Sequence, residues 1–400
     1  MDNTVLIVLD TLRKDYGDKY IWPVLEKYGF KKYDNAIAPA PWTTPTHVSM
    51  FTGMYPLYHG VHLRKERIEI GKVRLTPEIT ETVKESIGST FAVSANLFLS
   101  RAFGFPWKEE RIVEKMPSKV RIANVRDHKR VVELSNEGIP HRATVFIKEM
   151  LRRGYIDSLV RIGLHKAVNG LRALLSEWPK DKGAKDIARI VDGIDASQYD
   201  TIFVNLMEVH EPYTKFVGAY IMPHNPELVH RKYREFTKYL AKYVGSIIES
   251  LEKKGVERII VVADHGQMLG EHGAYGHTWW MYDELLRVPM YIKGIEVVNG
   301  DWISLTDVRN ALNRGKIAGG TYALADSFAM KDKDYRNMPK YRIAVYYKDY
   351  KGIFNVDDWK WESWKTYDGS EDVPENARKE MQKIVLRHLK GALAAKGVKG

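Results

Sequence analysis

The sequence predicts an α/β fold: a doubly wound, mostly parallel sheet flanked by helices, followed by a small C-terminal antiparallel sheet and helix. Five short apolar runs have the pattern of strands buried on both faces, and helix-forming stretches separate them. This alternation is typical of a parallel sheet covered by helices on both sides. The five runs are Thr4–Leu9, Ser89–Ser94, Thr201–Met207, Arg258–Ala263 and Val288–Ile292.

The character of the chain changes after Gly300. Tyr341–Tyr347 and Gly352–Trp361 alternate apolar and polar residues, which predicts antiparallel strands, and Glu375–Ala395 has the pattern of an amphipathic helix. We therefore expect a catalytic domain over residues 1–300 and a C-terminal subdomain over 301–400.

A basic segment at about 111–197 interrupts the predicted sheet. It is rich in helix formers, as in Lys148–Arg153 and Leu159–Leu175, and no run in it resembles a sheet strand. We interpret it as a helical insertion whose lysines and arginines form a solvated face rather than a polyanion site.

Composition limits the classes of protein and of site. The 400 residues carry a net charge of +11, which permits attraction to anionic substrates, nucleic acid or a membrane surface without choosing among them. No apolar run approaches a membrane span or a signal peptide core, so a cytoplasmic location is expected. The absence of cysteine excludes disulfides, thiolate metal sites and cysteine nucleophiles. Scarce glutamine beside many lysines and glutamates indicates a thermophilic source.

A hydroxyl group stands at the predicted start of a helix after a Pro-rich loop. Thr44 has the side chain of an N-cap, Pro45 suits the first turn and Gly53 can end the helix. Thr43 would then precede free backbone N–H groups that favour an anion. A hydroxyl beside an anion site becomes a nucleophile if a base or a metal removes its proton.

Acidic and histidine residues follow the predicted strands. Because the carboxyl ends of parallel strands form the ligand-binding edge of such sheets, we expect these side chains to gather there. Carboxylates and imidazoles are ligands for a divalent cation, and a metal-bound Thr43 hydroxyl would be acidified. The residues at these strand ends are Asp10, Glu208, His210, Asp264 and His265.

These motifs resemble the sulfatase branch of the alkaline phosphatase superfamily. The resemblance covers residues 4–292 in the family's order, whereas the insertion and the C-terminal part match it only in general architecture. Its most specific block is Ala263–Gly273. The other matching blocks are Val8–Asp15, Thr43–His47, Phe51–Pro56, His59-Gly60, Ser94–Asn96, Phe103–Phe105, Glu208–Tyr213, Gly276-His277 and Tyr282–Pro289.

Three departures modify what the resemblance implies. Hydrolytic sulfatases carry a cysteine or serine at the position of Thr43 and oxidise it to formylglycine, which a secondary alcohol cannot become. His47 stands where those enzymes have arginine, and Thr11 where a second Asp often follows the first. The spacing Thr43-x-Pro45-x-His47 is instead similar to the nucleotide pyrophosphatase and phosphodiesterase relatives, in which an unmodified threonine attacks phosphorus.

The resemblance implies an alkaline phosphatase-like fold and a metal-dependent hydrolase that cleaves phosphate mono- or diesters. Its partner would be a small anionic ester, with no membrane and with nucleic acid less favoured. A sulfuric ester hydrolase, a phospho-group transferase and a non-catalytic binding protein on the same scaffold stay open as alternatives. The substrate and the oligomeric state are not predicted.

The expected roles of the site residues follow from the same comparison. Thr43 would be the nucleophile, His210 would contact the anionic group, and Asp10, Thr43, Asp264 and His265 would hold one divalent ion, with Zn or Mn favoured over Mg or Ca. Glu208, His210 and His277 would either bind a second ion or contact the substrate directly. Residues expected near the site in structural roles are Arg13, His47, Asn96 and His272.

Overall fold

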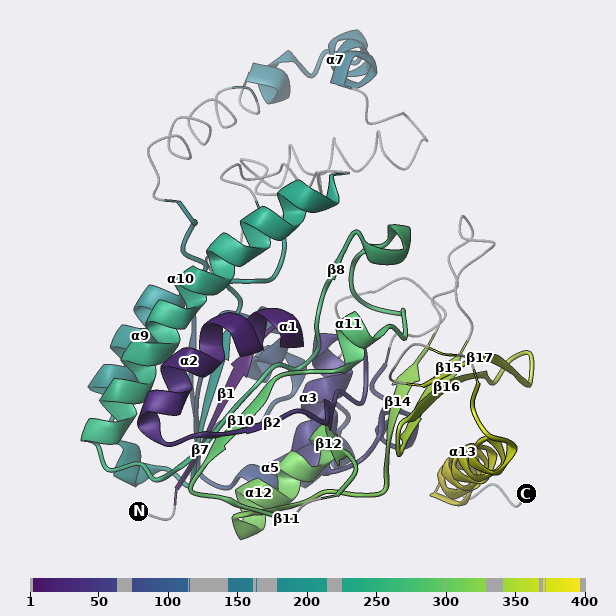
Figure 1. Cartoon of the computed structure of the whole chain (residues 1–400). Coiled ribbons are helices and arrows are strands. Elements are labelled where there is room, and N and C mark those ends of the chain that lie inside the picture. The colour runs from purple at the N-terminus through teal and green to yellow at the C-terminus, as the bar shows by residue number, and fades with distance from the viewer. Residues whose placement is uncertain are drawn as a thin grey trace. The chain divides into compact units, whose positions relative to one another are not determined.

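The computed structural model describes residues 3–62, 74–113, 143–160, 178–213, 225–298, 300–328, 341–366 and 372–395, together with residues 115, 163 and 370. Seven strands form the main sheet (Figure 1). They are β1 (Thr4–Leu9), β2 (Lys31–Tyr33), β4 (Thr90–Ser94), β5 (Glu109–Ile112), β6 (Thr201–Leu206), β7 (Arg258–Val262) and β10 (Met290–Lys293).

The strand order is β2-β10-β7-β1-β6-β4-β5, so the first strand of the chain lies in the middle of the sheet. β1 runs parallel to β6 and β7, and β4 runs parallel to β6 and β5. β10 is antiparallel to both β7 and β2. The predicted mostly parallel sheet is confirmed. β2 and β5 were not predicted, because these short edge strands are partly exposed and lack a buried apolar run.

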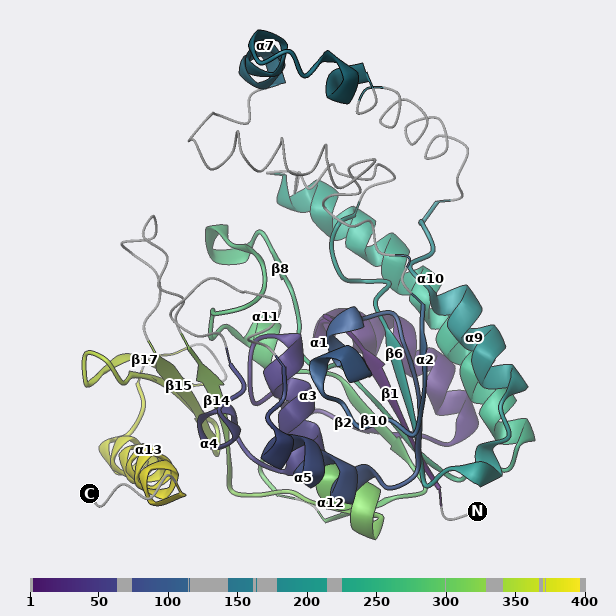
Figure 2. The same cartoon turned by 180° about the vertical axis from the view of Figure 1, so that it is seen from behind.

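Helices pack on both sides of this sheet (Figure 2). On one side α10 (Pro226–Lys253) packs with α9 (Ala184–Gly193) and α2 (Trp22–Leu25), and on the other α3 (Thr43–Thr52) packs with α5 (Pro77–Ile87) and α12 (Val308–Arg314). The long helix α10 buries one apolar stripe, spaced by three or four residues, as an amphipathic helix does. The stripe begins with Val229, Tyr233, Phe236 and Leu240.

The described chain contains shorter elements as well. The short helices are α1 (Lys14–Tyr16), α4 (Pro56–His59), α7 (Ala143–Arg152) and α11 (Asp283–Leu286). The short strands are β3 (Ala36–Ile37), β8 (Met268–Leu269), β9 (Tyr275–Gly276), β11 (Glu296–Val298), β12 (Ile303–Ser304) and β13 (Lys316–Ala318). No described helix is long and apolar enough to cross a membrane.

A separate four-stranded antiparallel sheet forms near the C-terminus, as predicted. It consists of β14 (Tyr322–Ser327), β15 (Arg342–Tyr347), β16 (Tyr350–Asn355) and β17 (Lys360–Thr366) in that order. The single strand expected over Gly352–Trp361 is wrong, because a turn after Asn355 divides this segment between β16 and β17. The final helix, α13 (Glu375–Ala395), has the predicted bounds.

The alternation along β15 explains why this sheet stays attached to the rest of the fold. Ala344 and Tyr346 pack into a cluster with Leu285 and Leu286 of α11, whereas Ile343 and Val345 pack against α13. Both faces of β15 are therefore buried, one against α11 and one against the last helix.

The contacts divide the chain into two compact units. The first contains residues 1–114, 182–211 and 224–400, and the second contains residues 115–181 and 212–223. Within the second unit, α7 includes most of the predicted helical stretch Lys148–Arg153, whereas most of the predicted helix Leu159–Leu175 lies outside the described residues. The domain boundaries expected from the sequence stay a prediction.

A cluster of charged side chains also joins the small sheet to α11. Asp283 Oδ1 accepts hydrogen bonds from Lys351 Nζ at 2.6 Å and from the Tyr346 hydroxyl at 2.7 Å, and Lys365 contacts Oδ2. The two lysines hold the pKa of Asp283 well below its usual value despite its burial. Because the side chain of Lys351 is only 3% exposed, its ammonium group depends on this carboxylate.

Replacing this carboxylate should destabilise the protein strongly. Asp283→Ala leaves the Lys351 ammonium buried without its counter-ion, so we expect the free energy of unfolding to fall by about 3–5 kcal/mol. Urea denaturation followed by circular dichroism measures this change. Asp349→Ala removes an exposed carboxylate from the same sheet and is the matched control. Equal stabilities for the two variants would contradict the assigned role.

Candidate active site

The register between β1 and β7 brings Asp10 and Asp264 together. In the parallel pair of β1 and β7, Val8 lies opposite Val262, so Asp10 and Asp264 each follow two residues later at the same level. Both side chains are fully buried at the carboxyl end of the sheet. The predicted convergence of strand-end residues thus follows directly from sheet pairing.

Helix α3 places the hydroxyl of Thr43 beside them. Trp42 is extended (φ −164°, ψ 164°), and the helix begins at Thr43 itself. The expectation that Thr44 caps this helix is wrong: Thr44 lies within the first turn, and its buried hydroxyl has no hydrogen-bond partner among the described residues. Gly53 ends the helix at φ 70°, as predicted.

The first cluster contains Asp10, Asp264 and His265, each of which offers one ligand atom within 4.8 Å of the others. Thr43 Oγ1 lies 3.5 Å from Asp10 Oδ2 and 3.3 Å from His265 Nε2. His265 Nε2 in turn lies 3.4 Å from Asp264 Oδ2. The four residues that the sequence analysis assigned to one metal site therefore lie side by side.

Among the described residues, the protein satisfies only one oxygen of each carboxylate in this cluster with hydrogen bonds. Burial raises the pKa of Asp10, with the neighbouring Asp264 adding to the effect, and burial raises the pKa of Asp264 to about 7. Asp10 Oδ1 and Asp264 Oδ2 accept no hydrogen bond from described residues. Two adjacent buried carboxylates with orphaned oxygens fit a cation between them, because a cation would stabilise both ionised forms.

The tautomer of His265 suits it for metal binding. Its Nδ1–H donates to the Gly266 carbonyl at 2.9 Å, which leaves the Nε2 lone pair facing Thr43. Burial lowers the pKa of His265 to about 4, so the ring is neutral at physiological pH. His47 instead donates from Nδ1 to the Thr43 carbonyl at 2.8 Å and fixes the first turn of α3, a structural role as expected from the sequence.

A second cluster lies next to the first and contains His210, Glu211 and His277. The ring centroids of His265 and His277 are 4.6 Å apart, and those of His210 and His277 are 5.1 Å apart. The structure thus brings His210 and His277 together as predicted, with Glu211 as the acidic member. Sequence reasoning missed Glu211, although it directly follows His210.

Glu208, predicted for this second site, lies outside the cluster. Its Oε1 accepts hydrogen bonds from the backbone N–H groups of Ala184 at 2.7 Å and Lys182 at 3.2 Å, and so holds the start of α9. The register explains the difference: Leu206 pairs with Leu9, so Met207 rather than Glu208 lies level with Asp10. A one-residue offset turns a side chain to the opposite face of a sheet.

Gln267 orients the second cluster and was also missed. Its amide nitrogen donates to Glu211 Oε2, and its Oε1 accepts from His277 Nδ1 at 2.8 Å. His210 Nδ1 donates to the Glu211 carbonyl at 2.7 Å. This leaves the Nε2 atoms of His210 and His277 available as ligand atoms. Burial lowers the pKa of His277 to about 3.

The remaining predicted residues occupy different positions. Asn96 donates from Nδ2 to Asp10 Oδ2 at 3.1 Å and contacts the first cluster. The Arg13 guanidinium pairs with Asp15 and Glu271, a structural role. His272 does not join the site, because its ring stacks on Tyr282 and its side chain is 47% exposed.

The residue after Asp10 has a strained backbone. Thr11 has φ 60°, a left-handed conformation that is rare for a β-branched residue. Its N–H donates to Asp264 Oδ1 at 3.1 Å, and its carbonyl accepts from the Tyr233 hydroxyl at 2.7 Å. The strained conformation thereby orients one carboxylate of the cluster, and Tyr233 of α10 stabilises it.

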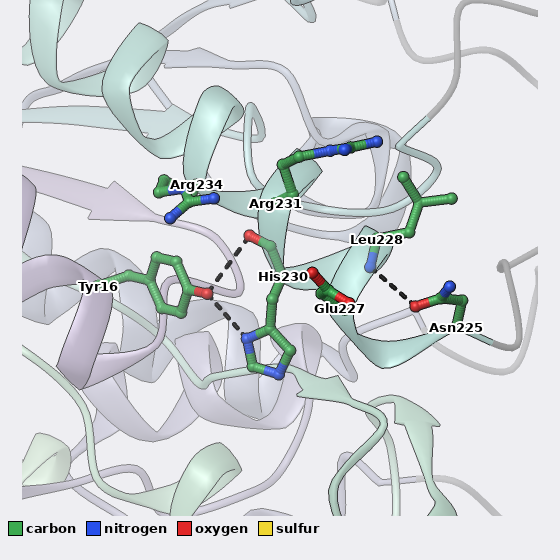
Figure 3. A pocket seen from close by; sticks show the side chains of 7 residues that line it. All are labelled: Tyr16, Asn225, Glu227, Leu228, His230, Arg231 and Arg234. Carbon is green, nitrogen blue, oxygen red and sulfur yellow. Dashed lines mark hydrogen bonds between the residues drawn. The ribbon is translucent and has the colours of Figure 1, made fainter.

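A hollow of about 500 Å³ opens beside Tyr16 and the first turns of α10 (Figure 3). The Tyr16 hydroxyl contacts His230 Nδ1 at 2.8 Å, and His230 Nε2 lies 3.2 Å from Glu271, the partner of Arg13. No described residue of its lining belongs to either histidine-containing cluster. The hollow is therefore distinct from the described metal-ligand clusters.

Solved structures with a similar architecture include a phosphonate monoester hydrolase and a sulfatase. Two solved structures align over nearly the whole chain, each with a TM-score of 0.60: the phosphonate monoester hydrolase SpPMH from Silicibacter pomeroyi (13% identity, 99% of this chain and 96% of that one) and BT1596, a 2-O GAG sulfatase (12% identity, 98% and 92%). At these identities the likeness concerns the fold alone.

The family model for type I phosphodiesterase / nucleotide pyrophosphatase matches residues 4–358, and the chain belongs to this family. A shorter match is to the low-salt glycan biosynthesis sulfotransferase Agl7 of Haloferax volcanii, with 32% identity over 95 residues. That match covers 22% of this chain and spans only 24% of the relative's length. The resemblance deduced from the motifs is thus confirmed at the level of the family and fold.

Metal removal should have a pH-dependent effect on stability. Because burial raises the pKa of Asp264 to about 7, the metal-free folded protein retains a proton that the unfolded chain, with its Asp pKa near about 4, releases. The free energy of unfolding of the metal-free protein should therefore fall as pH rises between these two values. A bound cation would displace the proton, so its stabilising effect should grow with pH.

This effect can be measured as the difference in melting temperature between protein with EDTA and protein with Zn or Mn, at about pH 5.5 and at about pH 8. We expect a larger cation-induced increase at the higher pH and a diminished increase in Asp264→Asn. An identical increase at both pH values, or none with any divalent ion, would contradict the site.

Proposed function

We propose that the chain is a metal-dependent phosphoesterase that uses Thr43 as an unmodified nucleophile. The observation that carries the proposal is the position of Thr43 Oγ1, at the N-terminus of α3 and within 3.5 Å of both Asp10 and His265. A hydroxyl in contact with a carboxylate and a neutral imidazole at a helix start has an acceptor for its proton and a site for an anion.

The donor set supports a divalent cation in the first cluster. Asp10, Asp264, His265 and the Thr43 oxygen offer three oxygens and one nitrogen, a mixture that suits Zn or Mn better than Ca. When bound, the cation would lower the pKa of the Thr43 hydroxyl and offset charge on the ester oxygens. His210, Glu211 and His277 form a candidate for a second cation, with direct contact to the substrate as the other use of these side chains.

The chain's own groups would carry out the substitution in two steps. Thr43 Oγ1 would form a bond to phosphorus as the bond to the leaving alcohol breaks, and the alcohol would depart with a proton. Water would then attack the phosphothreonine, which restores the hydroxyl and releases phosphate from a monoester substrate or a phosphate monoester from a diester substrate. The backbone N–H of Thr44, free of an intrahelical partner in the first turn, would stabilise the developing charge, whereas Pro45 has no N–H to contribute.

Phosphate esters are favoured over sulfate esters on chemical grounds. A threonine cannot form the hydrated aldehyde through which formylglycine sulfatases act, so no such cofactor group is expected at position 43. Phosphate esters also place more negative charge on their non-bridging oxygens than sulfate monoesters do. Cationic groups and a helix N-terminus stabilise the more anionic centre better.

Variants of the two adjacent threonines test the nucleophile. Thr43→Ala should lower kcat by at least about 10³-fold while the melting temperature stays close to that of the parent, and Thr43→Ser should keep part of the activity because it keeps a hydroxyl. Thr44→Val should retain most of the turnover, since the lost hydroxyl has no described hydrogen-bond partner. A Thr44 variant that is more damaging than Thr43→Ala would overturn the assignment.

The choice of ester can be tested by comparing kcat/KM for matched aryl esters. We expect faster cleavage of nitrophenyl phosphate or bis-nitrophenyl phosphate than of nitrophenyl sulfate, with Zn, Mn or Mg supplied, because the site favours the more anionic centre. Thr43→Ala measured in parallel excludes a contaminating enzyme. A clear preference for the sulfate would overturn the phosphoesterase assignment in favour of a sulfatase.

A further inference from the structure

The segment that follows the second cluster carries a pair of tryptophans. Trp279 and Trp280 come two and three residues after His277, so the Cα atom of Trp279 lies within about 7 Å of that of His277. The segment is fixed on both sides. The Thr278 N–H donates to the Pro41 carbonyl at 3.1 Å, in the loop before Thr43, and Ser327 Oγ of β14 donates to the Trp279 carbonyl at 2.8 Å.

A hollow of about 280 Å³ opens at this pair, between the segment and the C-terminal sheet. Most of its described lining is apolar or aromatic, and its charged groups are one ion pair between β15 and β17, the strands on either side of β16. The Arg342 guanidinium contacts both carboxylate oxygens of Glu362, at 2.5 and 2.8 Å. The described lining residues are Trp279, Trp280, Met281, Tyr282, Arg342, Ile353 and Glu362.

This lining favours a ligand with an apolar face and a polar rim. The ring planes of Trp279 and Trp280 are inclined by 46° with centroids 4.9 Å apart, which makes a bent surface rather than a flat slot. The puckered ring of a pyranose presents C–H groups that can pack on both inclined rings, whereas a flat nucleobase would stack on one ring at a time. The side chains of Arg342 and Glu362 are 20% and 24% exposed, so the pair can donate to and accept from hydroxyl groups at the rim.

We propose that this hollow binds a sugar ring, and that the ester cleaved at Thr43 is carried by a carbohydrate. The identity of the ester in this inference rests on the proposed function. The sugar-binding surface is argued separately, from the residues that line the hollow. Thr278, between His277 and Trp279, contacts the loop before Thr43, so we expect a phosphate on the bound sugar or on its neighbour to reach Thr43. The matched charges of Arg342 and Glu362 suit a neutral sugar ring at this position.

Binding can be tested without any catalysis. Saturation-transfer NMR with methyl glucoside, methyl galactoside and methyl mannoside at millimolar concentration reports directly on a sugar that contacts the protein. We expect a signal from at least one glycoside in the parent protein and about a tenfold weaker affinity in Trp279→Ala, the loss of one aromatic contact. Trp359→Ala removes a tryptophan that is 61% exposed on the same sheet and should bind as the parent does.

A second variant distinguishes a loss of sugar binding from a loss of folding. Glu362→Gln keeps the shape of the side chain and a partner for Arg342, but it removes the charged acceptor, so it should weaken glycoside binding while the melting temperature stays close to that of the parent. The proposal is overturned if no glycoside gives a signal, or if Trp279→Ala and Trp359→Ala bind equally. It is also overturned if adenosine monophosphate displaces the glycoside and loses affinity in Trp279→Ala, which would identify a nucleobase site.

Kinetics then separate this inference from the proposed function. The ratio of kcat/KM for glucose 6-phosphate or galactose 6-phosphate to that for nitrophenyl phosphate should fall about tenfold in Trp279→Ala. Glycoside binding without cleavage of any phosphate ester would keep the sugar site and overturn the phosphoesterase. Cleavage of phosphate esters without glycoside binding would keep the phosphoesterase and overturn the sugar site.

Discussion

The site depends on two carboxylates that the sheet forces together. Asp10 and Asp264 end adjacent parallel strands at the same level, both are fully buried, and each keeps an oxygen without a hydrogen bond from described residues. Such an arrangement is unfavourable unless the carboxylates are protonated or share a cation. The neutral ring of His265 and the hydroxyl of Thr43 lie beside them, so all four side chains offer ligand atoms to the proposed cation.

The two clusters differ in how the protein holds their ligands. In the first, backbone groups fix the ligands: the N–H groups of Thr11 and His265 hold Asp264, and the Gly266 carbonyl orients His265. In the second, the amide of Gln267 bridges Glu211 and His277, so one side chain sets two ligands at once. Outer partners of this kind set the tautomer and direction of a ligand.

The sequence was sufficient for the fold and for the first cluster, because buried strands and their end residues have a strong pattern. It was insufficient where a single-residue offset decides the outcome. Glu208 and Glu211 are both acidic and close to His210, and only the structure shows that Glu208 holds the start of α9 whereas Glu211 joins the second cluster. Likewise the start of α3 at Thr43 depends on the extended Trp42, which no capping pattern reveals. The turn after Asn355 interrupts an alternation that continues in the sequence.

The central position of β1 has a consequence for how the chain is synthesised. This strand precedes its two neighbours, β6 and β7, by about 200 and 250 residues along the chain, so it leaves the ribosome well before either of them. At translation rates of roughly 5–20 residues per second, Thr4–Leu9 would wait on the order of 10–40 s with both edges unpaired. A strand that is apolar from Val5 to Leu9 can pair with other nascent chains in that state, so early protection of this segment by chaperones would limit aggregation before the sheet is complete.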